Sequence, residues 1–195
     1  MSENPQGVFI DDVEFPFDDS SSILEFSNKS LGEKIIPTLC DDVNLKPYGA
    51  CRVCSVEVQQ TEDGPKRTVA SCHTPINPGM RIYTNSDSVK TLRRNIVELV
   101  LSDHPPDCLT CEVNGNCELQ DVAASVGVRR IRYAKGENHC DREKDLSHAY
   151  MRMDLSKCIN CSRCVRACDE VQGQFTLTMT GRGFESRITT DNDML

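Results

Sequence analysis

Apolar and polar residues alternate along the first 84 residues in short blocks that predict strands around a single helix. GVFI and VEFPF flank Asp11-Asp12, an arrangement typical of a β-hairpin. SSSILEFSNKSLG has serine N-cap candidates at positions 20–22 and a glycine at position 32, where a helix would end. The inward face of this helix is predicted to consist of Ile23, Phe26 and Leu31.

Three further strands are predicted in the second half of the same region. CSVEVQQ alternates as a strand, EDGP forms a turn, and KRTVASCHT returns as a strand that carries Cys72. GMRIYTNS forms the last strand. Two strands, a helix, a cysteine-bearing loop and a further hairpin are the element order of a β-grasp ferredoxin.

Helical spacing replaces alternation after position 84. A helix is predicted to start at a cap among Asn85, Ser86 and Asp87 and to end before Pro105-Pro106. Its apolar face is expected at Val89, Leu92, Ile96, Leu99 and Val100. CELQDVAASVG predicts a second helix that stops at Gly127. Its inward face is predicted to consist of Leu119, Val122, Ala123 and Val126.

Composition changes this picture because the predicted core is thin. Of the 195 residues 38% are hydrophobic and none is Trp, and small domains of this kind need disulfides or metals as additional support. The chain has 12 cysteines, no secretory signal and no apolar run long enough to insert directly into a membrane. We therefore expect a cytoplasmic protein whose cysteines bind metal rather than form disulfides. The net charge of −8 argues against a nucleic-acid partner.

The first cysteine set follows the pattern C-x10-C-x2-C-x17-C, with the ligand candidates Cys40, Cys51, Cys54 and Cys72. It is a variant of the plant-type [2Fe–2S] pattern with a longer first loop. Gly49 and Ala50 are small, so backbone N–H groups could approach the sulfurs of a cluster. A four-cysteine zinc knuckle is the alternative, although such sites usually use two C-x2-C pairs. His73 is predicted to be an exposed strand residue and not a ligand.

The second set is H-x3-C-x2-C-x5-C, with the ligand candidates His104, Cys108, Cys111 and Cys117. Cys117 should lie near a helix N-terminus, which favours a thiolate. Three thiolates and an imidazole suit either a [4Fe–4S] cluster or a structural zinc ion.

The residues between the second and third sets are given simpler roles. Arg129, Arg130 and Arg132 form either a solvated face or a surface that holds an acidic neighbour or tunes a cluster. His139, Cys140 and His148 lie in a polar loop without ligand spacing and are expected not to bind metal.

The third set, C-x2-C-x2-C-x3-C, is the bacterial ferredoxin pattern for a [4Fe–4S] cluster and comprises Cys158, Cys161, Cys164 and Cys168. Cys168 is expected to begin a helix and to point to another cluster. No cysteine follows it, and Asp169 replaces the expected proline. Either Cys168 completes its own cluster, a partner chain supplies a ligand, or the chain is cut short, which we favour. VQGQFTLTMTGRGFESRITTDNDML predicts two strands.

Together the three motifs resemble an iron–sulfur module over residues from about 6 to 195. It is shared by the large peripheral subunit of NADH:quinone oxidoreductase, iron-only hydrogenases, NAD-reducing hydrogenases and NAD-dependent formate dehydrogenases. The resemblance implies an α+β chain with three domains: a β-grasp [2Fe–2S] domain (1–84), a small helical [4Fe–4S] domain with one His and three Cys ligands (85–148), and the start of a bacterial-type ferredoxin domain (149–195). It implies one [2Fe–2S] and two [4Fe–4S] clusters, the second of these incomplete here.

IPTLCDD, LKPYGACRVCSVEV, HPPDCLTCEVNGNCELQD and CVRACDEVQG look most similar to the formate dehydrogenase alpha subunit. That resemblance implies electron transfer between a molybdenum or tungsten site and a flavin/NAD-binding partner, with no catalytic residue within these 195 residues. The alternative is an electron-transfer subunit of NADH:quinone oxidoreductase or a hydrogenase, although the respiratory subunit typically lacks a cysteine at the position of Cys168. A zinc-stabilised interaction protein is the other class considered.

Overall fold

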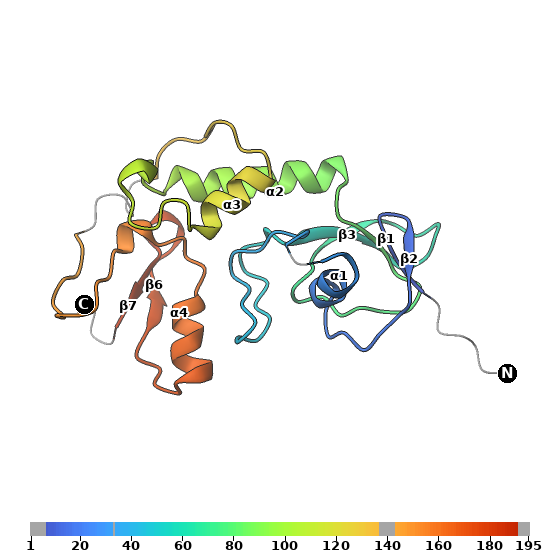
Figure 1. Cartoon of the computed structure of the whole chain (residues 1–195), viewed down its shortest axis with the longest axis horizontal. Helices are drawn as coiled ribbons and strands as arrows, with labels where there is room; N and C mark the ends of the chain where they lie inside the picture. The colour runs from blue at the N-terminus through green and yellow to red at the C-terminus, as the bar shows by residue number, and fades with distance from the viewer. Residues whose placement is uncertain (1–6, 33, 137–142, 191–195) are drawn as a thin grey trace. The chain divides into compact units, whose positions relative to one another are not determined.

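The computed structural model describes residues 7–32, 34–136 and 143–190 in two compact units (Figure 1). The first contains the residues up to Asp41 together with Pro47–Ile96. The second contains Asp42–Lys46 and the residues from Val97 onward. The elements form an α+β chain, as the sequence predicted.

The first unit is built on a five-stranded mixed sheet. In the order β2-β1-β5-β3-β4 its strands are Val13–Phe15, Val8–Ile10, Arg81–Tyr83, Ser55–Gln59 and Arg67–Ala70. β1 and β5 are parallel, while the other neighbours are antiparallel. This mixed order, with the first hairpin joined to the last strand, confirms the predicted β-grasp sheet.

The hairpin between β1 and β2 turns at Asp11 and Asp12, which both have positive φ (46° and 68°). A two-residue turn of this hand matches the twist of the strands, and Asp adopts it more readily than most residues. The Asp11 carboxylate also accepts hydrogen bonds from the Thr84 N–H and hydroxyl, which ties the turn to the end of β5.

Helix α1 (Ile23–Leu31) lies against the sheet (Figure 1). Ser22 is its N-cap, because its hydroxyl accepts the Glu25 N–H at 3.2 Å, and the Glu25 carboxylate reaches back to the Ser21 N–H at 2.8 Å. Gly32 ends the helix with φ 98°. The predicted inward face was wrong at one position, because Leu31 is exposed in the last turn.

The core of this unit lies between α1 and the sheet. It contains the buried residues Val8, Ile10, Ile23, Leu24, Phe26, Ile36, Cys54, Val56, Val58, Ala70, Cys72, Ile76, Met80 and Ile82. Two of the predicted ligands, Cys54 and Cys72, are therefore part of the hydrophobic core. The position of these two thiols therefore depends on the packing of this core.

Strand β4 ends at Ala70, so Cys72 and His73 lie in the turn that follows and not in the strand predicted for them. The Thr74 N–H donates to the Ala70 carbonyl at 3.1 Å, which closes this turn. His73 is exposed, as predicted.

Helix α2 (Asp87–Ser102) begins after Ser86, whose hydroxyl accepts the Val89 N–H at 3.2 Å. Its most buried positions in the first unit are Val89 and Arg93, while Leu99, predicted to face inward, is 46% exposed. The apolar pattern missed Arg93 because a buried charge is unexpected. Its guanidinium donates to the carbonyls of Ser55 (2.9 Å) and Thr84 (3.0 Å), and burial lowers its pKa to about 10.

The second unit contains short elements around two cysteine loops. Besides the last turns of α2, its described helices are η1 (Cys108–Thr110), α3 (Glu118–Ser125), η3 (Leu155–Lys157), α4 (Arg163–Arg166), η4 (Ala167–Val171) and η5 (Gly183–Glu185). Its strands β6 (Thr178–Thr180) and β7 (Arg187–Thr189) pair antiparallel, as the tail pattern predicted.

Helix α3 is buried on Leu119 and Val122 and stops at Gly127, which has φ 72°. The N–H groups of Gly127 and Val128 donate to the carbonyls of Ala124 (3.1 Å) and Ala123 (3.0 Å), which is a Schellman C-cap. The predicted stop signal is confirmed. Across the residues described, none of the helices has the length and apolarity needed to cross a bilayer.

Candidate metal centres

The four cysteines of the first set come together in the first unit, from three separate segments of the chain. The Sγ atoms of Cys54 and Cys72 are 3.4 Å apart, and the Cys51 N–H points to the Cys40 Sγ at 3.5 Å. Cys40, Cys54 and Cys72 are buried, and Cys51 is half-buried. Residues separated by up to 32 positions thus present soft donors to one point.

The thiols of this set are linked by hydrogen bonds that shift their pKa values in opposite directions. The pKa of Cys40 is lowered to about 2 by hydrogen bonds from the thiols of Cys51 and Cys72 and from the backbone N–H groups of Cys51 and Ala50. Interaction with Cys40 raises the pKa of Cys51 and of Cys72, while interaction with Cys72 lowers the pKa of Cys54. The set therefore favours the thiolate at Cys40 and at Cys54, and the thiolate is the form in which cysteine binds metal.

Local backbone geometry explains how the C-x2-C loop is formed. Gly49 has φ 70°, and a Cβ built on it would lie 3.3 Å from the His73 Cβ. Arg52 also has positive φ (62°), and its carbonyl accepts the Ser55 N–H (3.1 Å) and hydroxyl (2.6 Å). Left-handed residues turn consecutive N–H groups toward one side, where they can face a negatively charged group.

In the second set, His104 follows the end of α2, as the Pro-Pro break predicted. Its Nδ1 lies 3.1 Å from the Pro105 carbonyl. A carbonyl only accepts, so Nδ1 carries the proton and Nε2 keeps its lone pair for a metal. Burial lowers the pKa of His104, which favours the neutral imidazole that can act as a ligand.

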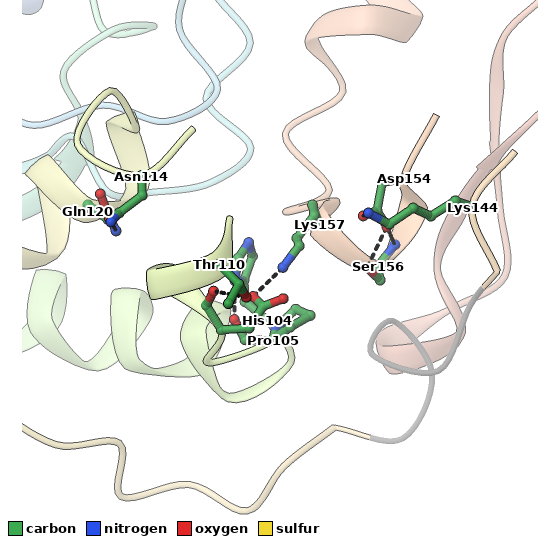
Figure 2. Close-up of polar contacts among 10 residues, drawn as sticks. His104, Pro105, Thr110, Asn114, Gln120, Lys144, Asp154, Ser156 and Lys157 are labelled. Atoms are coloured by element: carbon green, nitrogen blue, oxygen red, sulfur yellow. Dashed lines mark hydrogen bonds and ion pairs between the residues drawn. The ribbon is translucent and has the colours of Figure 1, made fainter. Parts of the chain in front are cut away.

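The three cysteines of this set are placed by short turns and by helix α3. Cys108 is in η1, and Cys117 is the N-cap of α3, as predicted. Gln120 of α3 closes the loop between them (Figure 2), since its side chain accepts the Gly115 N–H at 3.1 Å and donates to Asn114 Oδ1 at 2.9 Å. This role of Gln120 was not predicted from the sequence. The only available signal was its position in the first turn of the predicted helix.

The third set begins directly after η3 and continues through a loop into α4 and η4. Asn160 and Ser162 have positive φ, and the Asn160 N–H donates to Cys158 Sγ at 3.4 Å. The helix begins at Arg163, so Cys164 lies in its first turn and Cys168 in η4, its continuation. The prediction that Cys168 begins the helix was wrong, because the left-handed Ser162 starts it earlier.

The basic residues after α3 have separate roles. Arg129 and Arg130 are exposed, whereas Arg132 donates to Glu98 of α2, whose side chain is 4% exposed, at 2.6 Å. His148 is engaged in its own turn, where its Nδ1 accepts the N–H groups of Tyr150 and Met151. His139 and Cys140 lie outside the described residues.

The first donor set suits a sulfur-bridged cluster, because its four thiols converge. In the first and third sets a backbone N–H group points to a cysteine sulfur. The left-handed backbone of the third set could have been predicted at Asn160, because Asn adopts positive φ more readily than most residues. N–H groups directed at sulfur stabilise the negative charge of iron–sulfur clusters and help to set their potential.

Three family models match consecutive parts of the chain. Residues 8–87 match a 2Fe-2S iron-sulfur cluster binding domain, and residues 93–132 match the NADH-ubiquinone oxidoreductase-G iron-sulfur binding region. Residues 149–194 match the ferredoxin-like domain of NADH-quinone oxidoreductase subunit 3. The matches confirm the predicted cofactor classes, which are one [2Fe–2S] cluster and up to two [4Fe–4S] clusters.

Curated relatives come from two kinds of enzyme complex. The NADP-reducing hydrogenase subunit HndD of Solidesulfovibrio fructosivorans is 42% identical over 159 residues, or 78% of this chain and 26% of the relative. The G subunit of NADH-quinone oxidoreductase from Rickettsia prowazekii is 31% identical over 187 residues, or 93% of this chain and 26% of the relative. The chain thus spans about a quarter of the length of each.

A solved structure has the same fold over nearly the whole chain. It is a chain of an NAD⁺-reducing [NiFe]-hydrogenase in the H₂-reduced state, 30% identical, with a TM-score of 0.82. The match covers 95% of this chain and 75% of the hydrogenase chain.

Proposed function

Since the chain belongs to the family of iron–sulfur modules shared by the G subunit of NADH-quinone oxidoreductase and subunits of NAD(P)-reducing hydrogenases, we propose that it relays single electrons within such a complex. The observation that carries this proposal is the convergence of Cys40, Cys51, Cys54 and Cys72, with N–H groups directed at Cys40. Such a site holds a redox group and needs no proton-transfer residue.

We assign one ligand set to each cluster. A [2Fe–2S] cluster is held by Cys40, Cys51, Cys54 and Cys72. A [4Fe–4S] cluster is held by His104 through Nε2 together with Cys108, Cys111 and Cys117. A second [4Fe–4S] cluster uses Cys158, Cys161 and Cys164, with Cys168 as ligand to the same or to a neighbouring cluster. These sets correspond to the three domains 1–84, 85–148 and 149–195.

The protein side of the relay consists of holding and tuning the clusters, which supply the one-electron chemistry when bound. Burial of Cys40, Cys54 and Cys72 keeps water from the first site. The Asn160 and Cys51 N–H groups stabilise sulfur charge, and the Pro105 carbonyl orients His104. Each feature acts on ligand orientation or reduction potential.

The relatives favour a hydrogenase or NADH-quinone oxidoreductase context over formate oxidation. A flavin/NAD-binding subunit is the partner we propose, because the relatives' names refer to NADH or NADP. A formate dehydrogenase with a molybdenum or tungsten domain stays a narrower prediction from the cysteine motifs.

Metal analysis and spectroscopy test this proposal. Anaerobically purified protein should contain iron and acid-labile sulfide, and the reduced sample should show [2Fe–2S] and [4Fe–4S] EPR signals. A colourless protein that contains zinc and no iron would contradict the proposal and support a zinc-stabilised interaction protein.

A further inference from the structure

Two ion pairs in the second unit join the loop of the His104 set to the loop of the Cys158 set. Lys157 is paired with Asp107, and the Arg163 Nη1 lies 2.5 Å from Glu118 Oε2. Figure 2 shows the Lys157 side chain directed toward the loop that carries His104. These two pairs connect segments that are about 50 residues apart in sequence.

All four members of these pairs stand next to a proposed cluster ligand in the sequence. Asp107 precedes Cys108, and Lys157 precedes Cys158. Glu118 follows Cys117, and Arg163 precedes Cys164. A shift of either partner would therefore move a ligand with it.

The backbone at these positions is held by short helical turns. Asp107 is the N-cap of η1 and Lys157 is the last residue of η3. Glu118 and Arg163 are the first residues of α3 and α4. Turns fixed in this way transmit the position of a side chain to the neighbouring cysteine more directly than a flexible loop would.

Both cations are also shielded from solvent more than an ordinary surface charge. The side chains of Lys157 and Arg163 are 23% and 24% exposed. Lys157, Asp107 and Cys111 line one cavity of about 720 Å³. Arg152 and Glu112 line the same cavity, but their side chains are 74% and 79% exposed, so water screens the attraction between them.

We propose that the pairs Asp107–Lys157 and Glu118–Arg163 position the two [4Fe–4S] clusters relative to each other and so maintain the cluster spacing on which electron transfer between them depends. This inference rests on the proposed function. It assigns to four charged side chains a role beyond that of the ligands. The spacing of two paramagnetic clusters is measurable, because their magnetic interaction splits or broadens the EPR signals.

The test uses the cluster-loaded full chain, fully reduced, in low-temperature EPR. In the variant Lys157→Glu two carboxylates lie opposite each other at this pair and repel. The inter-cluster splitting should therefore weaken, while iron content and the [2Fe–2S] signal stay unchanged. Asp107→Lys combined with Lys157→Glu should restore the splitting, and so should the conservative Lys157→Arg. Arg163→Glu should act like Lys157→Glu. The matched control, Arg152→Glu at the exposed pair, should retain the wild-type splitting.

Several outcomes would overturn the inference. Wild-type protein with both [4Fe–4S] clusters but no splitting would do so, as would unchanged splitting in Lys157→Glu and Arg163→Glu. If Lys157→Glu fails to load clusters, the charge-swapped variant decides, since loaded protein with weaker splitting contradicts the role of the pair. If the swapped variant also fails to load, the inference is rejected. A wild-type protein without iron would instead reject the proposed function and, with it, this inference.

Discussion

Arg93 is the residue whose replacement tests most directly how α2 supports the first cysteine site. It is 5% exposed, and its guanidinium links α2 to the carbonyl of Ser55 at the start of β3 and to that of Thr84 after β5. Ser55 directly follows the proposed ligand Cys54. We consider Arg93→Met, which preserves much of the side-chain volume and removes every donor.

The expected magnitude is a difference between two opposing effects. Two hydrogen bonds from a charged donor are lost, each worth about 1.5–3 kcal/mol, for about 3–6 kcal/mol in all. Replacing the buried charge also removes the free-energy cost of its desolvation, which stabilises the variant. The lowered pKa of Arg93, from 12.5 to about 10, sets that cost at about 3 kcal/mol. The difference is about 0–3 kcal/mol. Ser55 and Thr84 are buried and their carbonyls would lose the Arg93 donors, so we expect the upper part of this range, a loss of about 1.4–3 kcal/mol.

Native-state hydrogen exchange is the appropriate assay, because bound clusters make global unfolding depart from two-state behaviour. Amides of β3 should exchange roughly 10-fold to 100-fold faster in Arg93→Met, as about 1.4 kcal/mol corresponds to a factor of ten. Arg94→Met is the matched control, since Arg94 is the exposed neighbour on the same helix. Equal protection in the two variants would refute the view that the buried guanidinium holds β3 in place.

Three further changes test other parts of the structure. His104→Ala should disturb one [4Fe–4S] EPR signal and spare the [2Fe–2S] signal; loss of both would mean that the two sites do not form independently. Gly127→Ala should destabilise the end of α3 by about 1 kcal/mol, because φ is 72° and nothing lies near the added methyl group, so faster exchange of α3 amides is expected and unchanged exchange would contradict the backbone argument. Hydrogen bonds from Ser21 lower the pKa of Glu25 from 4.5 to about 2, so its stabilisation is present above pH 4.5 and is lost as the pH falls toward 2. Ser21→Ala should reduce this acid-dependent loss of stability, which solvent exposure limits to about 1 kcal/mol. Thermal melts between about pH 6 and about pH 2 measure the loss. Melting temperatures that change with pH in the same way as those of the wild type would contradict the prediction.

Sequence alone determined the features that depend on short-range chemistry. The hairpin at Asp11-Asp12, the cap at Ser22 and the stop at Gly127 follow from the preferences of a few neighbouring residues, and the structure has all three. The spacing of the three cysteine sets likewise predicted the cofactor classes that the family matches confirm. Spacing carries this information because a cluster requires donors at fixed separations along a loop.

Only the tertiary structure decided which distant groups meet. Apolar periodicity placed Leu99 inside and overlooked Arg93, because the two carbonyls that satisfy its charge belong to β3 and to the end of β5. Neighbouring residues could not indicate that Lys157 would pair with Asp107 across 50 positions. Buried charges are stable only where partners converge, and convergence is a property of the folded chain. Candidate ligands could therefore be proposed from sequence, whereas the residues that hold them in place could not.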